Sequence, residues 1–247
     1  MFVTDTHGDK VDQGAAKVAL DFEAWFRPEI RIHGGDACDF AWLRKNAGEE
    51  DKDAETMKAD VEAACHFMDA YRPTHFIEGS HDKRAREARE SSRGAVKALA
   101  AEFHKRLRYV VEDVHHAEVF EWGKRKGVMR LGDYALIHGY ASGLQATRQH
   151  AQVYGNVIHG HLHRSQTETV PRMGDGSDVA VGHAVGCLWQ LDLGYNDGHL
   201  QTLQQQHGFA YGWLHEGGMH EPPIVTVYNV TPDRDGRWRF PTEERVA

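Results

Sequence analysis

Aspartate and histidine residues gather in five short clusters between the start of the chain and Arg164, and each cluster follows an apolar run. The clusters read Asp5-Thr6-His7, Gly35-Asp36, Gly79-Ser80-His81-Asp82, His138-Gly139 and His159-Gly160-His161-Leu162-His163. In an open α/β sheet, ligands bind outside the carboxyl ends of the strands, so we expect the five clusters to meet at one edge. The glycines beside them allow sharp turns and a close approach of the backbone to an ion.

The residue types in these clusters predict a metal site. Residues i and i+2 lie on the same side of a strand, so Asp5 with His7, and His161 with His163, are natural ligand pairs. A mixed set of histidines and aspartates suits manganese, iron, zinc, cobalt or nickel, whereas magnesium and calcium prefer oxygen ligands. The ligands are too many for one ion, and a carboxylate can bridge two ions that hold phosphoryl oxygens and a water. The clusters therefore predict cleavage of a phosphate ester.

Each motif alone is a weak signal, because a lone Asp-x-His or Gly-Asp arises often by chance. The signal is the joint occurrence of five clusters in this order, each at the end of an apolar run. Asp39 stays outside the ligand set and has two interpretations, a carboxylate behind the metal ligands or a helix cap. We place His159 in the core, and we expect structural or surface roles for His33, His75, His115 and His116.

The order of these motifs resembles the calcineurin-like metallophosphoesterase superfamily, in particular its stand-alone bacterial and phage-borne members, over Met1 to Arg164. The resemblance implies that one ion is held by Asp5, His7 and His163, that Asp36 bridges, and that the other ion is held by Ser80, His138 and His161. It implies that a hydroxide bridging the two ions attacks phosphorus in line. Manganese is the ion that we expect first. It also implies that His81 assists the leaving group and that Asp82 orients His81.

One position departs from the family pattern. The sequence has Ser80 where the family usually has asparagine in Gly-Asn-His-Asp. An asparagine carbonyl reaches further than a serine hydroxyl and is a better neutral ligand. We therefore expect weaker binding of the second ion, or binding through a water.

Basic residues near the predicted centre bear on the substrate. Two interpretations fit Arg84 and Arg86, which lie at the start of the helix after His81. They bind a substrate phosphate, or they belong to a solvated helix face. A second cluster, Lys124, Arg125, Lys126 and Arg130, falls in a segment typical of a hairpin, and turn charge alone explains it. Together the two patches favour a phosphodiester substrate, a nucleotide or nucleic acid.

Three alternatives stay open beside a phosphodiesterase. A phosphomonoesterase of the same fold would use the same ligands. Loss of His81 would favour a catalytically silent metal-binding module, but His81 is present here. Hydrolases of the metallo-β-lactamase or amidohydrolase type share the His-x-His pair of His161 and His163, but they need further ligands, such as an HxHxDH run, that this sequence lacks.

Strands and helices alternate in the first half of the chain. Apolar runs predict buried strands at 2–4, 29–32, 75–77, 134–137 and 156–158. Apolar residues at helical spacing predict helices that contain Val11 to Trp25 and Met57 to Met68. They also predict one long helix from about Arg84 to Leu107, with Val96, Leu99, Phe103 and Leu107 on one apolar face. From about Thr167 strands dominate, at 179–190, 209–216 and 224–230, divided by turns at 174–176, 217–218 and 222–223.

The predicted fold class is α/β, with two mixed β-sheets packed as a sandwich between helices in four layers, α/β/β/α. The late strands are expected to form the second sheet on top of the first. The 247 residues predict a single domain over 1–247. 

Bulk composition narrows the functional classes. A net charge of −8 argues against a general nucleic-acid coat protein, so nucleic-acid contacts should be local. Three cysteines without a CxxC spacing indicate neither a disulfide framework nor a cysteine zinc site, and a reducing cytoplasm fits best. No apolar run reaches the length of a membrane span, and no secretion signal is visible. The 18 histidines are the compositional hint of metal chemistry.

Overall fold

The computed structural model describes residues 1–171, 179–191, 204–217 and 223–240. The first of its two sheets has the strand order β11-β10-β1-β2-β3-β4. These strands are β1 (Phe2–Val3), β2 (Ile32–His33), β3 (His75–Ile77), β4 (Glu118–Phe120), β10 (Phe209–His215) and β11 (Ile224–Val230). Strands β1 to β4 are parallel, and β10 and β11 extend the sheet in antiparallel fashion.

The second sheet has the order β5-β6-β7-β9-β8. Its strands are β5 (Met129–Leu131), β6 (Tyr134–Ile137), β7 (Val157–His159), β8 (Gln166–Pro171) and β9 (Val179–Ala184). The central strands β6, β7 and β9 are parallel, and the edge strands β5 and β8 pair antiparallel to them. Both sheets are therefore mixed, and their parallel strands place the carboxyl ends of β1, β2, β3, β6 and β7 along shared edges.

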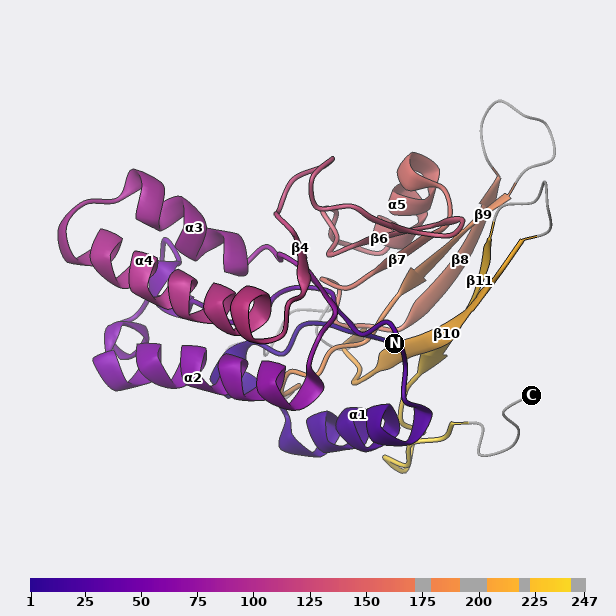
Figure 1. The fold of residues 1–247 in the computed structure, drawn as a ribbon, viewed down its shortest axis with the longest axis horizontal. Coiled ribbons are helices and arrows are strands. Elements are labelled where there is room, and N and C mark those ends of the chain that lie inside the picture. Colours follow the sequence, from indigo (N-terminus) through magenta and orange to yellow (C-terminus); the bar gives the residue numbers. More distant parts are fainter. Residues whose placement is uncertain (172–178, 192–203, 218–222, 241–247) are drawn as a thin grey trace.

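Helices cover the outer faces of both sheets (Figure 1). They are α1 (Gln13–Phe26), α2 (Ala54–Tyr71), α3 (Asp82–Ser91), α4 (Gly94–Arg108) and α5 (Ala146–Tyr154). Short helical turns are η1 (Gly8–Lys10), η2 (Ala41–Leu43), η3 (Glu50–Lys52) and η4 (Tyr109–Val114). Asp12 and Asp53 cap α1 and α2 by accepting from backbone N–H groups of the first turn, which satisfies donors that the helix leaves unpaired.

Alternation along the strands separates the layers. In β6, Leu136 packs between the sheets, whereas Ala135 and Ile137 pack with Ala151 of α5. In β1, Phe2 faces the second sheet and Val3 packs with Phe22 of α1. Because successive side chains of a strand point to opposite faces, each sheet buries one face on the other sheet and one face on helices. The architecture is the predicted four-layer α/β/β/α sandwich.

Three details differ from the sequence prediction. The late strands do not form the second sheet by themselves: β10 and β11 join the first sheet, and β8 and β9 complete the second. The long helix is two helices, because the chain leaves helical geometry at Ser92 and Gly94 has φ +61°. In α4 the buried residues are Ala100, His104 and Leu107, whereas Val96 and Leu99 are exposed.

The predicted hairpin at the basic cluster is also wrong. Residues Gly123 to Gly127 connect β4 of the first sheet to β5 of the second, and the hairpin lies one step later, between β5 and β6. The predicted turns at 174–176, and positions 218 and 222, lie outside the described residues. Among the described helices, none combines the length and the apolar character that crossing a membrane requires.

Candidate metal centre

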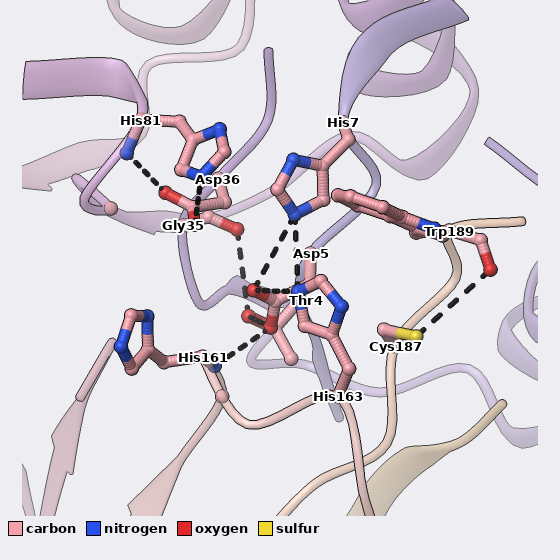
Figure 2. Close-up of polar contacts among 12 residues, drawn as sticks. Thr4, Asp5, His7, Gly35, Asp36, His81, His161, His163, Cys187 and Trp189 are labelled. Carbon is pink, nitrogen blue, oxygen red and sulfur yellow. Dashed lines mark hydrogen bonds and ion pairs between the residues drawn. The ribbon is translucent and has the colours of Figure 1, made fainter. Parts of the chain in front are cut away.

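The loops that follow five parallel strands bring the predicted ligands together. Asp5 and His7 follow β1, Asp36 follows β2, and Ser80 and His81 lie between β3 and α3. The second sheet supplies His138 after β6 and the pair His161 and His163 after β7. Figure 2 shows side chains from both sheets converging on Asp5 and Asp36. The ligand set is thus assembled across the sandwich.

The backbone at these positions is unusual. Asp5, His7, Asp36, His161 and His163 all have positive φ, between 50° and 70°. Non-glycine residues rarely adopt this left-handed conformation, and such strain gathers at functional sites. Backbone hydrogen bonds between the β1 and β2 loops hold it in place, with Asp5 N donating to Gly35 O at 2.9 Å and His7 N to Asp36 O at 3.0 Å.

Two glycines are required by close approach of the ligand loops. A Cβ atom at Gly79 would lie 2.2 Å from the backbone nitrogen and from Oδ1 of Asp36. A Cβ atom at Gly160 would lie 2.5 Å from Asp5 Oδ2. Larger residues at either position would push the aspartates away, so these glycines of the motifs serve packing of the site.

Asp5, His7 and His163 form the first candidate ligand group. The Nε2 atoms of His7 and His163 lie 3.2 Å apart, and His163 Nε2 lies 3.2 Å from Asp5 Oδ1 (Figure 2). The other carboxylate oxygen, Asp5 Oδ2, accepts from Thr4 Oγ1 at 2.7 Å and from His161 N at 3.0 Å. These two bonds fix the carboxylate and leave Oδ1 directed towards the histidines.

Asp36, His138 and His161 form the second group. His138 Nε2 lies 3.1 Å from Asp36 Oδ2, and the rings of His138 and His161 are in edge contact at 5.2 Å. His138 Nδ1 donates to the carbonyl of Gly34 at 2.9 Å, which fixes the tautomer and leaves Nε2 for a ligand. Ser80 Oγ donates to Asp36 Oδ2 at 3.2 Å, so the serine lies beside this group.

A third combination, His7 with Asp36 and His81, links the two groups. His81 Nε2 lies 3.9 Å from Asp36 Oδ2, and the rings of His7 and His81 meet edge to face at 4.6 Å. Asp36 belongs to two of the three combinations, and so does His7. The ligand atoms therefore form one continuous cluster with Asp36 near its middle.

The cluster fits divalent metal ions. Asp5 Oδ1, His138 Nε2 and His163 Nδ1 are buried and have no hydrogen-bond partner among the described residues. Buried polar atoms are almost always satisfied, so exceptions call for a ligand. Two imidazole nitrogens facing each other beside a carboxylate match the chemistry of manganese, iron or zinc sites. The residues present could therefore hold metal ions.

Burial and neighbouring charges shift the protonation of the cluster. Burial would raise the pKa of Asp5 and of Asp36, but His163 beside Asp5 and His138 beside Asp36 hold both well below their usual range. Burial lowers the pKa of His7 and of His161 to about 4. The carboxylates are therefore ionised and these two imidazoles neutral at pH 7, which is the state that metal ligands need.

His138 differs from the other imidazoles of the cluster. Burial lowers its pKa, but the Asp36 carboxylate outweighs burial and raises it to about 9. An ion bound between Asp36 and His138 would take the place of this proton.

The structure changes the role predicted for Asp82. His81 Nδ1 donates to the Asp39 carboxylate at 2.8 Å, and Asp39 Oδ1 also lies 3.4 Å from His7 Nδ1. Asp82 instead accepts from the backbone N–H groups of Ala37, Cys38 and Gly79. Asp82 is the first residue of α3, and its carboxylate is turned towards the loops after β2 and β3, which carry these N–H groups. The residue that orients His81 is Asp39, which caps no helix.

The two candidate substrate arginines have different surroundings. Arg86 donates from Nε to both carboxylate oxygens of the buried Glu78, at 3.2 and 3.0 Å, so we correct its predicted substrate contact to a structural ion pair. Arg84 donates from Nη1 to the carbonyl of Asp39 at 3.2 Å. Within the described part of the chain, no carboxylate lies within ion-pair distance of Arg84, whose guanidinium lies next to the His81 loop.

Three residues near the cluster were missed by the sequence prediction. Arg44 binds both oxygens of Asp39, at 2.6 and 2.8 Å. Trp189 packs its ring on His7 and His163, at 4.3 and 4.9 Å. Asp60 of α2 accepts from the backbone of Asp39 and Phe40. Asp60 alone carried a signal, because it is an acidic residue next to Val61 on the apolar face of a predicted helix.

The remaining histidines of interest are structural. His159 is fully buried, packs against His150 at 4.4 Å and bonds Thr147. His33 accepts from Gly35 N and bonds Thr6, so it supports the loop before Asp36. Both positions agree with the structural roles expected for them.

Comparison with known proteins gives little beyond this geometry. No protein-family profile matches the chain, and no curated protein matches it. Several solved structures are similar, among them a novel archaeal phosphodiesterase at 15% identity and a TM-score of 0.42, covering 91% of this chain and 98% of that chain. A likeness at this level carries no argument about chemistry, so function rests on the cluster itself.

Proposed function

We propose that the chain is a metal-dependent phosphodiesterase with two metal ions. The observation that carries the proposal is the pair of buried ligand groups, Asp5-His7-His163 and Asp36-His138-His161, built from the ends of strands in both sheets. Asp36 stands between them with one oxygen near His138 and the other accepting from His81 N at 2.6 Å. A carboxylate in this place suits the bridging position of a two-metal site.

In the proposed enzyme, Asp5, His7 and His163 hold one ion, Asp36 is shared, and His138 and His161 hold the other, with Ser80 beside them. When bound, the ions would neutralise charge on the phosphoryl oxygens and lower the pKa of a water. Manganese is the ion we favour, because four histidines and two carboxylates shared between the two groups suit a borderline metal.

His81 is proposed as the group that protonates the leaving alcohol. Its Nδ1–H donates to Asp39, so the proton that can be given away is the one at Nε2, on the side of the ring that faces Asp36. A carboxylate behind an imidazole stabilises the protonated ring and holds its orientation. Arg84 is proposed to bind a phosphate oxygen, since its guanidinium lies at the same loop and lacks a carboxylate partner among the described residues.

The test is release of nitrophenol from bis-(p-nitrophenyl) phosphate, with and without added Mn²⁺, with p-nitrophenyl phosphate in parallel. We expect turnover that depends on Mn²⁺ and favours the diester. Preference for the monoester would make the chain a phosphomonoesterase. Silence on both, in protein that contains metal, would overturn the enzymatic proposal and leave a metal-binding module.

Asp36→Asn is the decisive variant for this assay. It removes the charge between the two groups while keeping the shape of the side chain, so we expect loss of bound metal and a fall in rate of about a thousandfold or more. Asp21→Asn, on the exposed face of α1 where Asp21 pairs with Lys17, is the matched control. Full activity of Asp36→Asn would contradict the shared position of Asp36.

A further inference from the structure

A partly exposed tryptophan stands next to the metal centre on the side of the second ligand group. The Trp122 ring lies 5.7 Å from the ring of His138 and 4.8 Å from the ring of Tyr140. Lys83, in the first turn of α3, places its ammonium 5.1 Å from the centre of the Trp122 ring. An aromatic ring therefore borders the candidate ligand His138, and a cation lies over that ring. Lys83 also approaches Glu87, at 3.7 Å.

The position of Trp122 is fixed from two sides. Its backbone N–H donates to the buried carboxylate of Glu78 at 2.8 Å, and Glu78 is the last residue before the Gly79-Ser80-His81 loop. Tyr140, two residues after His138, packs against the indole and donates its hydroxyl to Gly123 O at 2.7 Å. The ring is thus held between the loops that carry His81 and His138.

The basic turn that follows Trp122 points to an anionic partner. Lys124, Arg125 and Lys126 are exposed. Gly127 N closes the turn on Gly123 O at 2.8 Å, and Tyr154 donates to Lys124 O at 3.3 Å. Lys126 approaches Glu121 at 3.9 Å, but in the described ranges no carboxylate lies within ion-pair distance of Lys124 or Arg125. Although the net charge of the chain is −8, this turn is locally positive.

We infer that Trp122, Lys83 and the turn 123–127 form a substrate subsite that stacks a nucleobase beside the metal centre and binds the neighbouring phosphates of a single-stranded nucleic acid. Every nucleobase has a π face that stacks on an aromatic side chain, and cations beside it track the backbone. An unpaired base is required, because a base within a duplex cannot reach an indole. This subsite rests on the proposed phosphodiesterase and specifies its substrate.

The base subsite is tested with two esters that share a leaving group, thymidine 5′-(p-nitrophenyl phosphate) and methyl p-nitrophenyl phosphate. We expect the parent to prefer the nucleoside ester in kcat/KM, and Trp122→Ala to reduce this preference roughly tenfold, the usual scale for loss of one stacked base. Trp122→Phe should restore most of it. Trp25→Ala, which removes an exposed tryptophan of α1, is the control.

The phosphate contacts are tested by binding of a labelled single-stranded oligothymidylate in EDTA, followed by fluorescence anisotropy at several salt concentrations. Lys124→Gln with Arg125→Gln should weaken binding and lower the slope of log affinity against log salt by roughly one to two. The control pair is Lys97→Gln with Lys105→Gln, two exposed lysines of α4.

The outcomes separate the subsite from the proposed function. If the parent cleaves both esters and Trp122→Ala slows both equally, the base subsite is wrong and the phosphodiesterase stands. If the parent cleaves neither ester, the proposed function fails, and the oligonucleotide experiment decides the subsite alone. Binding that is unchanged in both Trp122→Ala and the Lys124/Arg125 variant would overturn it.

Discussion

At the scale of single residues, Asp39 connects a candidate metal ligand with the proposed catalytic acid. Its carboxylate contacts Nδ1 of His7, a candidate ligand, and Nδ1 of His81, the proposed acid, and Arg44 holds it from the other side. Burial would raise the pKa of Asp39, but the two histidines hold it far below its usual range. The ionised carboxylate therefore fixes the tautomer of both rings.

We expect Asp39→Asn to lower turnover by about tenfold to a hundredfold, the common cost of losing a carboxylate behind a functional histidine. The measurement is kcat on the diester together with metal content. In a His81→Ala background the same change should cost less, because the two residues act as a unit. Fully additive effects, with metal content unchanged, would show that Asp39 does not act through His81.

Ser80 carries the second prediction at this scale. Its hydroxyl donates to the same oxygen of Asp36 that lies 3.1 Å from His138 Nε2. Asparagine offers a carbonyl that reaches further, so Ser80→Asn should tighten the weaker of two metal-binding steps by about tenfold, equal to about 1.4 kcal/mol. Metal titration by calorimetry measures it, with Ser80→Ala as comparison. An unchanged titration in both variants would mean that Ser80 is not a ligand.

At the scale of elements, the buried Glu78 joins β3, α3, α4 and the segment after β4. Its carboxylate contacts Arg86 of α3, lies 3.8 Å from His104 of α4 and accepts from Trp122 N. Burial raises the pKa of Glu78, but His104, Trp122 N–H and Arg86 together lower it. Its ion pair therefore contributes stability above the unfolded pKa of about 4.5, and this stability is lost as the pH falls.

Arg86→Met should lower the free energy of unfolding at pH 7 by about 3 kcal/mol, because it leaves a buried carboxylate without its arginine partner. Urea denaturation followed by circular dichroism measures the change, and Arg93→Met, at an exposed position between α3 and α4, is the control. Adding Glu78→Gln to Arg86→Met should recover part of the loss. A loss no larger than that of the control would place Arg86 outside the supporting structure.

The elements also show what the sequence could predict. Strands β3, β6 and β11 have the predicted limits, because each is a short run of mostly apolar or β-branched residues. The position of β10 and β11 in the first sheet was not predictable. Alternation of apolar and polar residues indicates a strand but not the strand with which it pairs. The prediction of one long helix was wrong, because the helix is interrupted at Ser92. Val96 and Leu99 continued the helical spacing of apolar residues in the sequence, but both side chains are exposed in the fold.

The sequence could predict which side chains gather in the candidate site, but not the residues that position them. Asp5, His7, Asp36 and His163 stand in local motifs that the sequence displays. Arg44, Trp189 and the contact of His81 with Asp39 arise only when loops far apart in the chain meet. Asp82 was misassigned because it neighbours His81 in sequence, whereas the turn into α3 directs its carboxylate to the backbone of the β2 loop.

At the scale of the whole molecule, the sandwich is held together by buried polar groups as well as by apolar packing. The Asp36 loop of the first sheet meets His138 of the second, and Asn229 of β11 donates to Ala184 O of β9. Buried titratable groups of both signs lie throughout the fold. Burial raises the pKa of Asp60 to about 7 and of Asp82 to about 8, and it lowers that of His183 in β9 to about 4.

These groups give the fold a pH dependence that single variants can separate. His183 bonds the hydroxyls of Tyr134 and Thr167 as a neutral ring, at 3.3 and 3.2 Å. Below pH 6.5 the unfolded chain binds a proton at this position that the folded chain refuses until about pH 4, so its contribution is present above pH 6.5 and is lost as the pH falls. The raised pKa values of Asp60 and Asp82 make the folded state more stable as the pH falls, which is the opposite effect. The pH dependence of the parent's stability alone therefore does not test His183.

The test is therefore the difference between the parent and His183→Gln in metal-free protein. Glutamine keeps a donor and an acceptor but cannot take up the proton, so the parent should lose about 2 kcal/mol more than the variant between pH 7 and pH 5. Urea denaturation at the two pH values measures this difference, with His66→Gln at an exposed position of α2 as control. Parallel losses in parent and variant would mean that the folded chain accepts the proton on His183, because the cost of burying the charged ring would then be met by its two hydroxyl partners.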